Sequence, residues 1–276
     1  MEREKPQTSL MRPVLVAVMA VWATVALPLV EDATAQTPVS IELVFAVDTS
    51  MSIDGFEYQL LMKGIASAFR TPEVVSLIEQ QNGVAVTLFQ WSSEVDQQYV
   101  IPWHLLNDSA SVLAFAAKVE MAKRDPNRLF TGIGGALEFG VHLIAENIFE
   151  GRQLKIDVSG DGRNNIGIPP SMPQKKANAL GIVINGLPIL TYTNADSFDL
   201  ENYYREEVIQ GPGAFIEIAD DYEDFARAFL RKLLREISPL VSQENSDPRM
   251  RVQETRGPST TINLSPVGTR TNRGKR

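Results

Sequence analysis

The sequence predicts a three-layer α/β domain, in which helices cover both faces of a doubly wound, mostly parallel sheet with one antiparallel edge strand. Short apolar runs alternate with segments of helical period between Gln36 and Ser238. Several runs are continuously apolar, which is typical of strands that are buried on both faces. Polar clusters follow two of the runs directly, beginning at Asp48 and Ser159. Parallel sheets bind ligands at such strand ends.

The predicted strands are short runs of mainly branched and aromatic residues. The first of them, IELVFAV, stops abruptly at a polar cluster. In chain order, strands are expected at residues 41–47, 83–91, 97–102, 154–158, within 181–190, and at 215–219. Because only a short polar turn separates the second run from the third, these two are expected to pair in antiparallel fashion.

The segments between the strands show helix signals. Asp54 is expected to cap the first helix, and Thr71 with Pro72 to begin the second. Asn107 or Asp108 is expected to cap the third helix. The later helices are expected at 107–121, 131–149, 174–180 and 222–237. The predicted buried stripes are Leu61, Ile65 and Phe69; Ile133, Leu137, Ile144 and Ile148; and Phe225, Phe229, Leu233 and Ile237.

The two ends of the chain differ from this middle part, which is predicted to be one domain spanning residues 36–238. In residues 1–35, a basic start precedes an uncharged apolar run and the small-residue site Ala33-Thr34-Ala35, the layout of a secretory signal peptide. A retained membrane anchor is the alternative, although Pro28 interrupts the run. We expect an exported protein, periplasmic or secreted, without stable membrane insertion after cleavage. Residues 239–276 are predicted to be a flexible basic tail, rich in Ser, Thr and Pro.

The composition restricts the chemistry. The 276 residues include no Cys and two His, which excludes a disulfide scaffold, a thiolate site and most histidine-based zinc sites. The formal charge is −8; the first 35 residues carry −1 and residues 239–276 carry +4, which leaves −11 for the middle. This acidity argues against nucleic acid as a partner. Any metal would need oxygen ligands, which favours hard ions.

Three polar groups lie where the strand rule places ligand sites. They are Asp48, Ser50 and Ser52 after the first strand, Thr131 at the start of a helix, and Asp161 after a later strand. Two carboxylates and three hydroxyls suit an octahedral hard cation and leave a position open for an incoming carboxylate. Taken singly, each has a simpler interpretation: Asp48 and Ser50 as a helix cap, Thr131 as an N-cap, and Asp161-Gly162 as a turn.

The order D-x-S-x-S, then Thr131, then Asp161-Gly162 resembles the metal-ion-dependent adhesion site of von Willebrand factor A-type (vWA) domains, which have a Rossmann-like fold. The similarity extends over nearly all of residues 36–238. The stretch from Ile156 to Asn165 resembles an uncharacterised family of exported bacterial proteins with a single domain of this type (DUF1194-like).

This resemblance implies roles for the five residues. Ser50 and Ser52 would bind the metal directly, and Asp48 through a water molecule or directly. Thr131 would bind when a partner occupies the site, and Asp161 would act mostly through water. The ion would be Mg²⁺, with Mn²⁺ or Ca²⁺ as alternatives. Gly160 departs from the family pattern, which has Thr before this Asp.

The predicted function is that of a binding module, which engages an unknown protein partner through a metal-coordinating Asp or Glu. Neighbouring loops would set specificity, through Glu94, Arg128, Arg163 and Asn164. An enzyme is not expected, because no motif supplies a general base or a G-x-S-x-G nucleophile. Two alternatives remain: a metal-dependent hydrolase, in which Asp48 and Asp161 hold an ion that activates water, and a structural or assembly subunit with an unused metal site.

Overall fold

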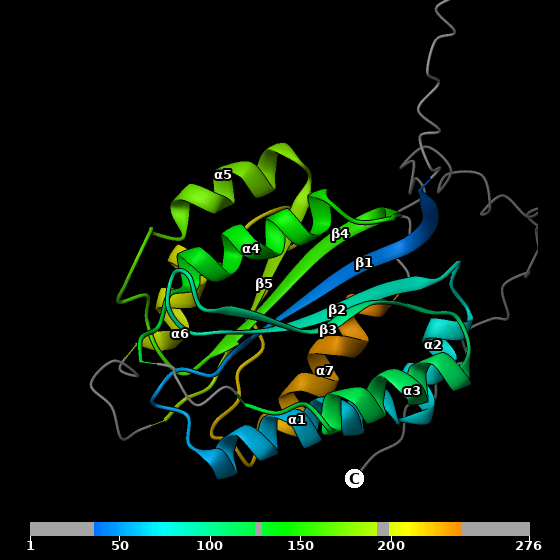
Figure 1. Ribbon diagram of the computed structural model, residues 1–276, viewed down its shortest axis with the longest axis horizontal. Helices are drawn as coiled ribbons and strands as arrows, with labels where there is room; N and C mark the ends of the chain where they lie inside the picture. The colour runs from blue at the N-terminus through cyan, green and yellow to red at the C-terminus, as the bar shows by residue number, and fades with distance from the viewer. Residues whose placement is uncertain (1–35, 125–128, 192–198, 239–276) are drawn as a thin grey trace, which may run out of the picture. The chain divides into compact units, whose positions relative to one another are not determined.

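A computed structural model describes residues 36–124, 129–191 and 199–238. The predicted signal peptide and tail lie outside the described residues. Five strands form one sheet in the order β3-β2-β1-β4-β5 (Figure 1). They are β1 Thr37–Asp48, β2 Val84–Trp91, β3 Gln97–Leu106, β4 Phe149–Gly160 and β5 Ile182–Pro188. All neighbours are parallel except β2 and β3, which are antiparallel. The predicted sheet with one antiparallel edge strand is therefore confirmed.

Strand β1 lies at the centre of the sheet, and the strand order reverses there. Its last residues pair with the ends of both neighbours, Asp48 with Trp91 of β2 and Val47 with Ser159 of β4. The loops that follow β1 and β4 therefore leave the sheet side by side. This is the topological switch point, where open α/β sheets bind ligands.

Helices cover both faces of the sheet, as predicted, and Figure 1 shows α1, α3 and α7 on one side with α4 and α5 on the other. The first layer is α1 Gly55–Phe69, α2 Pro72–Glu79, α3 Ser109–Glu120 and α7 Phe225–Ile237. The second is α4 Ile133–Ala145, α5 Ser171–Ala179, α6 Leu200–Tyr203 and the π-helical turn η2 Tyr204–Val208. Successive residues of β1 face opposite layers, with Leu43 and Phe45 in one core and Val44 and Ala46 in the other. This arrangement explains the continuous apolar run.

The predicted helix starts are largely confirmed. The Asp54 carboxylate accepts hydrogen bonds from the backbone N–H groups of Phe56 (2.7 Å) and Glu57 (2.8 Å), and Glu57 bonds back to the Asp54 N–H. This reciprocal pair is a capping box, which satisfies backbone donors that the first helical turn leaves free. Asp108, one of the two predicted caps, begins α3 in the same way. Thr71 and Pro72 begin α2, although the Thr71 side chain makes no capping bond.

The helix predicted at 131–149 is shorter in the structure. It ends at Ala145 because the Asn147 side chain donates to the carbonyl of Ile144 (2.8 Å) and accepts from the Phe149 N–H (2.6 Å). Phe149 is already the first residue of β4. The prediction that Ile148 faces the core is therefore wrong, and its side chain is 69% exposed.

The chain after β5 also differs from the prediction. The segment expected as a strand at 215–219 makes only isolated parallel bridges, Gly186 with Ile216 and Ile189 with Ala219. Neither α6 nor η2 was predicted, and α7 begins at Phe225 rather than at 222. The predicted inner stripe of α7 is confirmed as buried. Among the described helices, none combines the length and apolar character needed to cross a membrane.

Candidate metal centre

The structure brings the five predicted ligands to one edge of the sheet. Asp48 is the last residue of β1, and Ser50 and Ser52 lie in the turn that leads to α1. Asp161 follows β4 directly. A Cβ atom built on Gly162 would lie 3.5 Å from the Thr131 hydroxyl oxygen, which places Thr131 beside the Asp161 loop. Because β1 and β4 are parallel neighbours, residues more than 100 positions apart meet at their carboxyl ends.

Short polar contacts connect three of these side chains and hold Asp48 to the turn after β1. The Ser52 hydroxyl donates to Asp161 Oδ1 (2.7 Å) and lies 3.1 Å from the Ser50 hydroxyl. Asp48 Oδ1 accepts a hydrogen bond from the Ser50 backbone N–H (2.8 Å). The side chains of Asp48, Ser50 and Asp161 are each 1% exposed. Ser52 is exposed, so the cluster opens to solvent at that residue.

The simpler interpretations as helix caps are wrong. Asp54, not Asp48 or Ser50, caps α1. Helix α4 has Gly132 as its N-cap and no side-chain capping bond, so the Thr131 hydroxyl is not used there. The side-chain oxygens of Asp48, Ser50 and Thr131 are thus not used to cap the helices that follow them.

The electrostatics of the cluster favour a cation. Burial raises the pKa of Asp48 well above its usual range, and the negative charge of Asp161 raises it further. Burial also raises the pKa of Asp161. The Oδ2 atoms of both carboxylates are buried without a hydrogen-bond partner of normal geometry, although the nearby Tyr222 hydroxyl lowers the pKa of Asp161. Two buried like charges with unsatisfied oxygens are costly, and a divalent cation would offset that cost.

The donor set also fits a hard cation by its chemistry. Within the described ranges, no group of three or more His, Cys, Asp or Glu side chains could hold a metal ion. An ion between Asp48 and Asp161 would therefore need the hydroxyls of Ser50, Ser52 and Thr131 as further ligands. Carboxylate and hydroxyl oxygens with water suit Mg²⁺, which commonly binds through one or two carboxylates.

The departure at position 160 has a steric reason. A Cβ atom on Gly160 would lie 2.7 Å from Asp48 Oδ2 and 3.1 Å from the hydroxyl of Tyr204. Tyr204, which begins η2 and is fully buried, fills the space that a Thr side chain would need. Sequence reasoning missed this residue because no signal in the chain predicts η2.

Arg124 is a second residue near the cluster that sequence reasoning missed. Its guanidinium donates to the backbone carbonyls of Thr49 (3.2 Å) and Ser50 (2.9 Å), and so holds the turn that carries two of the predicted ligands. Its positive charge also opposes the rise in the pKa of Asp48. The contact joins segments about 75 residues apart, so only the folded chain reveals it.

Two asparagines position the Thr131 segment. The Thr131 N–H donates to Asn165 Oδ1 (2.9 Å), and the Asn165 N–H donates to the Thr131 carbonyl (2.9 Å). The Gly134 N–H donates to Asn164 Oδ1 (3.0 Å). These bonds connect the start of α4 to the loop after Asp161, so Asn164 has a structural role in addition to the predicted contact with a partner.

Substituting Gly134 is expected to disturb this connection. A Cβ atom at position 134 would lie 1.9 Å from the carbonyl oxygen of Ile168, a backbone atom that cannot move aside cheaply. We expect Gly134→Ala to lower the free energy of unfolding by about 1–3 kcal/mol, the usual cost of overpacking, as measured by urea denaturation. Ala136→Gly, in the same turn of α4, tests for general helix weakening and is expected to cost about 1 kcal/mol from helix propensity, plus the loss of its buried methyl group. An unchanged Gly134→Ala variant would contradict the assigned packing.

Two more of the predicted partner-contact residues, Glu94 and Arg163, lie in loops near the cluster. Glu94 lies in the exposed turn between β2 and β3, whose Ser92 carbonyl accepts from the Gly132 N–H (2.5 Å). Arg163 lies 5.2 Å from the centre of the Tyr203 ring and 3.8 Å from Asp199 Oδ2. Arg128 lies outside the described residues. Contact of these residues with a partner stays a prediction.

The fold, with helices on both faces of a doubly wound sheet, is that of von Willebrand factor A-type domains. Solved structures support this fold. The PilB minor pilin from Streptococcus sanguinis matches with a TM-score of 0.51 and 14% identity, over 73% of this chain and 61% of that one. The pilus adhesin SpaC from Lactobacillus rhamnosus GG matches with a TM-score of 0.50 and 14% identity, over 72% and 30%. The chain thus spans less than two thirds of either protein.

The family model described as "Protein of unknown function (DUF1194)" matches residues 38–241, and the chain belongs to that family. The match begins within β1 and extends past the end of α7, so it includes all five predicted ligands. A search of curated proteins by sequence gives no match.

Proposed function

We propose that this domain is a binding module that holds a divalent cation, Mg²⁺ first, through Asp48, Ser50, Ser52, Thr131 and Asp161. Through that cation it would engage an Asp or Glu side chain of a protein partner. We further propose that the protein is exported and that this site does not catalyse a reaction. The pilin and adhesin neighbours share only the fold, which is compatible with such a role.

The convergence of the predicted ligands carries this proposal. The hydrogen bond from the Ser52 hydroxyl to Asp161 Oδ1 joins residues 109 positions apart. Beside it, the Asp48 and Asp161 carboxylates each keep one buried oxygen without a hydrogen-bond partner of normal geometry. Such an arrangement costs free energy in the absence of a cation, so its presence in the fold favours a site made to hold one.

The small number of protein charges explains why the partner would be acidic. Two carboxylates just balance a divalent ion, and the hydroxyls of serine and threonine add no charge. The five protein ligands leave one octahedral position open. Because they bring only two negative charges, the ion keeps an affinity for a further carboxylate. Because residues 36–238 carry a formal charge of −11, the surrounding field would repel acidic partners without the ion.

A capture experiment tests this proposal. The protein is immobilised in Mg²⁺ and exposed to the exported fraction of its source cell, and bound protein is eluted with EDTA. We expect Ser50→Ala to abolish the Mg²⁺-dependent capture, because it removes one buried ligand oxygen, while the far-UV circular dichroism stays unchanged. Ser67→Ala, an exposed position on α1, is the matched control and is expected to capture normally. Equal capture in Mg²⁺ and EDTA would contradict the proposal.

A further inference from the structure

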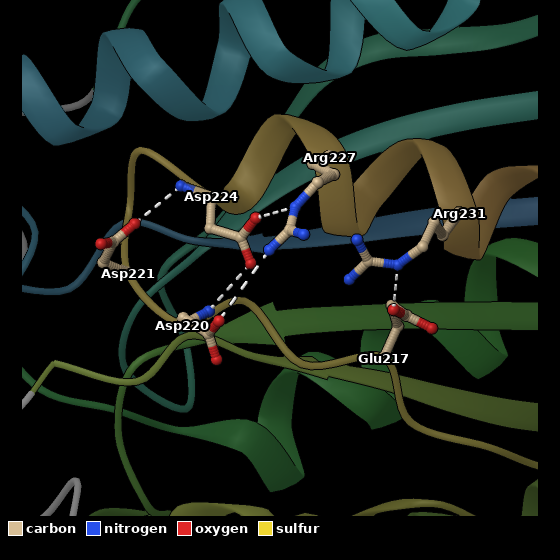
Figure 2. Close-up of polar contacts among 6 residues, drawn as sticks. All are labelled: Glu217, Asp220, Asp221, Asp224, Arg227 and Arg231. Atoms are coloured by element: carbon tan, nitrogen blue, oxygen red, sulfur yellow. Dashed lines mark hydrogen bonds and ion pairs between the residues drawn. The ribbon is translucent and has the colours of Figure 1, made fainter.

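Helix α7 carries a row of arginines, Arg227, Arg231 and Arg235, at four-residue spacing on one face. Figure 2 shows the first two, each directed at carboxylates of the preceding segment. Arg227 Nε lies 2.5 Å from Asp224 Oδ1, and Arg231 Nε lies 2.5 Å from Glu217 Oε1. The first two arginines of the row thus form ordinary ion pairs with nearby carboxylates.

Arg235 breaks this pattern. No described carboxylate pairs with it, and its guanidinium instead lies 3.7 Å from the centre of the Phe215 ring. Arg235 also lines a cavity of about 490 Å³ between the end of α7, the start of β5 and the loop before Phe215. The polar residues that line this cavity also include Arg152, Lys155, Asn185 and Glu236.

Among the described arginines, the two that have neither a carboxylate nor a backbone carbonyl as a partner both lie at this cavity. Five of the described arginines pair with a carboxylate, namely Arg70, Arg163, Arg205, Arg227 and Arg231. Arg124 bonds to the backbone of the metal centre. The two that remain, Arg152 and Arg235, both line the cavity. The domain has a large excess of acidic groups, so two arginines without a carboxylate partner at the same cavity are unexpected.

Glu236 offsets only part of the positive charge at this cavity. Its Oε1 accepts from Lys232 Nζ (2.7 Å) and Asn185 Nδ2 (2.8 Å), while its buried Oε2 has no hydrogen-bond partner. Lys155, the third cation of the lining, donates only to the backbone carbonyl of Glu236. Burial lowers the pKa of Lys155, although the charge of Glu236 opposes that shift. Arg152, Lys155 and Arg235, against the single carboxylate of Glu236, leave the cavity positive.

We propose that this cavity binds a small organic anion, with a carboxylate held by Arg235 and Arg152 and an apolar body against Phe215, Leu154 and Val183. Guanidinium groups bind carboxylates in bidentate fashion. The cavity volume lies within the usual range for small-molecule sites, which combine apolar walls with a few placed polar groups. The site lies at the amino-terminal end of β5, so it is separate from the candidate metal centre, which lies at the carboxyl ends of β1 and β4.

Titration with benzoate tests the proposal, because benzoate combines one carboxylate with an apolar ring. The full chain is labelled with ¹⁵N and kept in EDTA, so that no cation at the metal centre can bind the probe. We expect saturable amide shifts confined to residues around Phe215, Asn185 and Arg235. Arg235→Gln is expected to weaken binding about tenfold, the effect of losing one charge-assisted contact. Arg152→Gln is expected to weaken it as well.

Arg231→Gln is the matched control, because it removes an arginine from the same helix face that already has a carboxylate partner. It is expected to leave the benzoate affinity unchanged. Shifts that stay linear to high concentration, or that persist unchanged in Arg235→Gln, would overturn the proposal. Equal weakening by Arg231→Gln would overturn it too, because it would show a general charge effect. Inorganic phosphate binding as tightly as benzoate would contradict the role of the apolar walls.

Discussion

Replacing Asp48 with Asn is expected to weaken Mg²⁺ binding by about a hundredfold or more while the fold is retained. Loss of one charged partner from a buried ionic site commonly costs about 3–5 kcal/mol, and each 1.4 kcal/mol is a factor of ten in affinity. The Asn side chain has the same shape, and its oxygen can still accept the 2.8 Å bond from the Ser50 N–H. The substitution also removes the repulsion between Asp48 and Asp161.

Two measurements check this expectation. Isothermal titration calorimetry gives the Mg²⁺ affinity, and urea unfolding in EDTA gives the stability without metal. The stability in EDTA is expected to equal or exceed that of the unsubstituted protein, because two buried like charges become one. Asp220→Asn, which changes an exposed carboxylate near Arg227, is the control and is expected to bind Mg²⁺ normally. An unchanged Mg²⁺ affinity in Asp48→Asn would refute the metal centre.

The second large effect is expected at Lys232, which is fully buried beneath the sheet. Its Nζ lies 2.7 Å from both Asp157 Oδ1 and Glu236 Oε1. Lys232→Met would leave two buried carboxylates without their cation, and we expect the free energy of unfolding to fall by about 3–5 kcal/mol at neutral pH. Urea denaturation measures the loss. Lys63→Met on the exposed face of α1 is expected to stay within about 0.5 kcal/mol.

The loss should depend on pH. Burial raises the pKa of Asp157 from its usual 3.8 to about 7, while the charge of Lys232 opposes the rise. The folded state therefore binds more protons than the unfolded state between these values, and this group makes stability fall as pH rises from about 4 to about 7. Without Lys232 the folded pKa would rise further. The destabilisation by Lys232→Met is thus expected to be larger at pH 8 than at pH 5, and equal losses at both would contradict it.

Much of the fold follows from local patterns that need no tertiary context. The apolar run ending at Asp48, the capping signal at Asp54 and the helical stripe ending at Ile237 each reflect short-range geometry, and each is confirmed. The failures lie where local signals are weak or conflict. Ile148 has the right spacing for the core, yet the Asn147 side chain ends the helix before it.

The features of the candidate site likewise divide into those that the sequence predicts and those that only the folded chain shows. The sequence by itself limited any metal ligands to oxygen atoms, because it has no Cys and only two His, and the ends of the apolar strands predicted where those ligands would lie. Only the tertiary structure decided how these ligands are supported. The Arg124 contact to the Ser50 carbonyl and the Tyr204 hydroxyl in place of a side chain at Gly160 both join distant segments. Tertiary packing brings these residues together, and no spacing along the chain encodes their contacts.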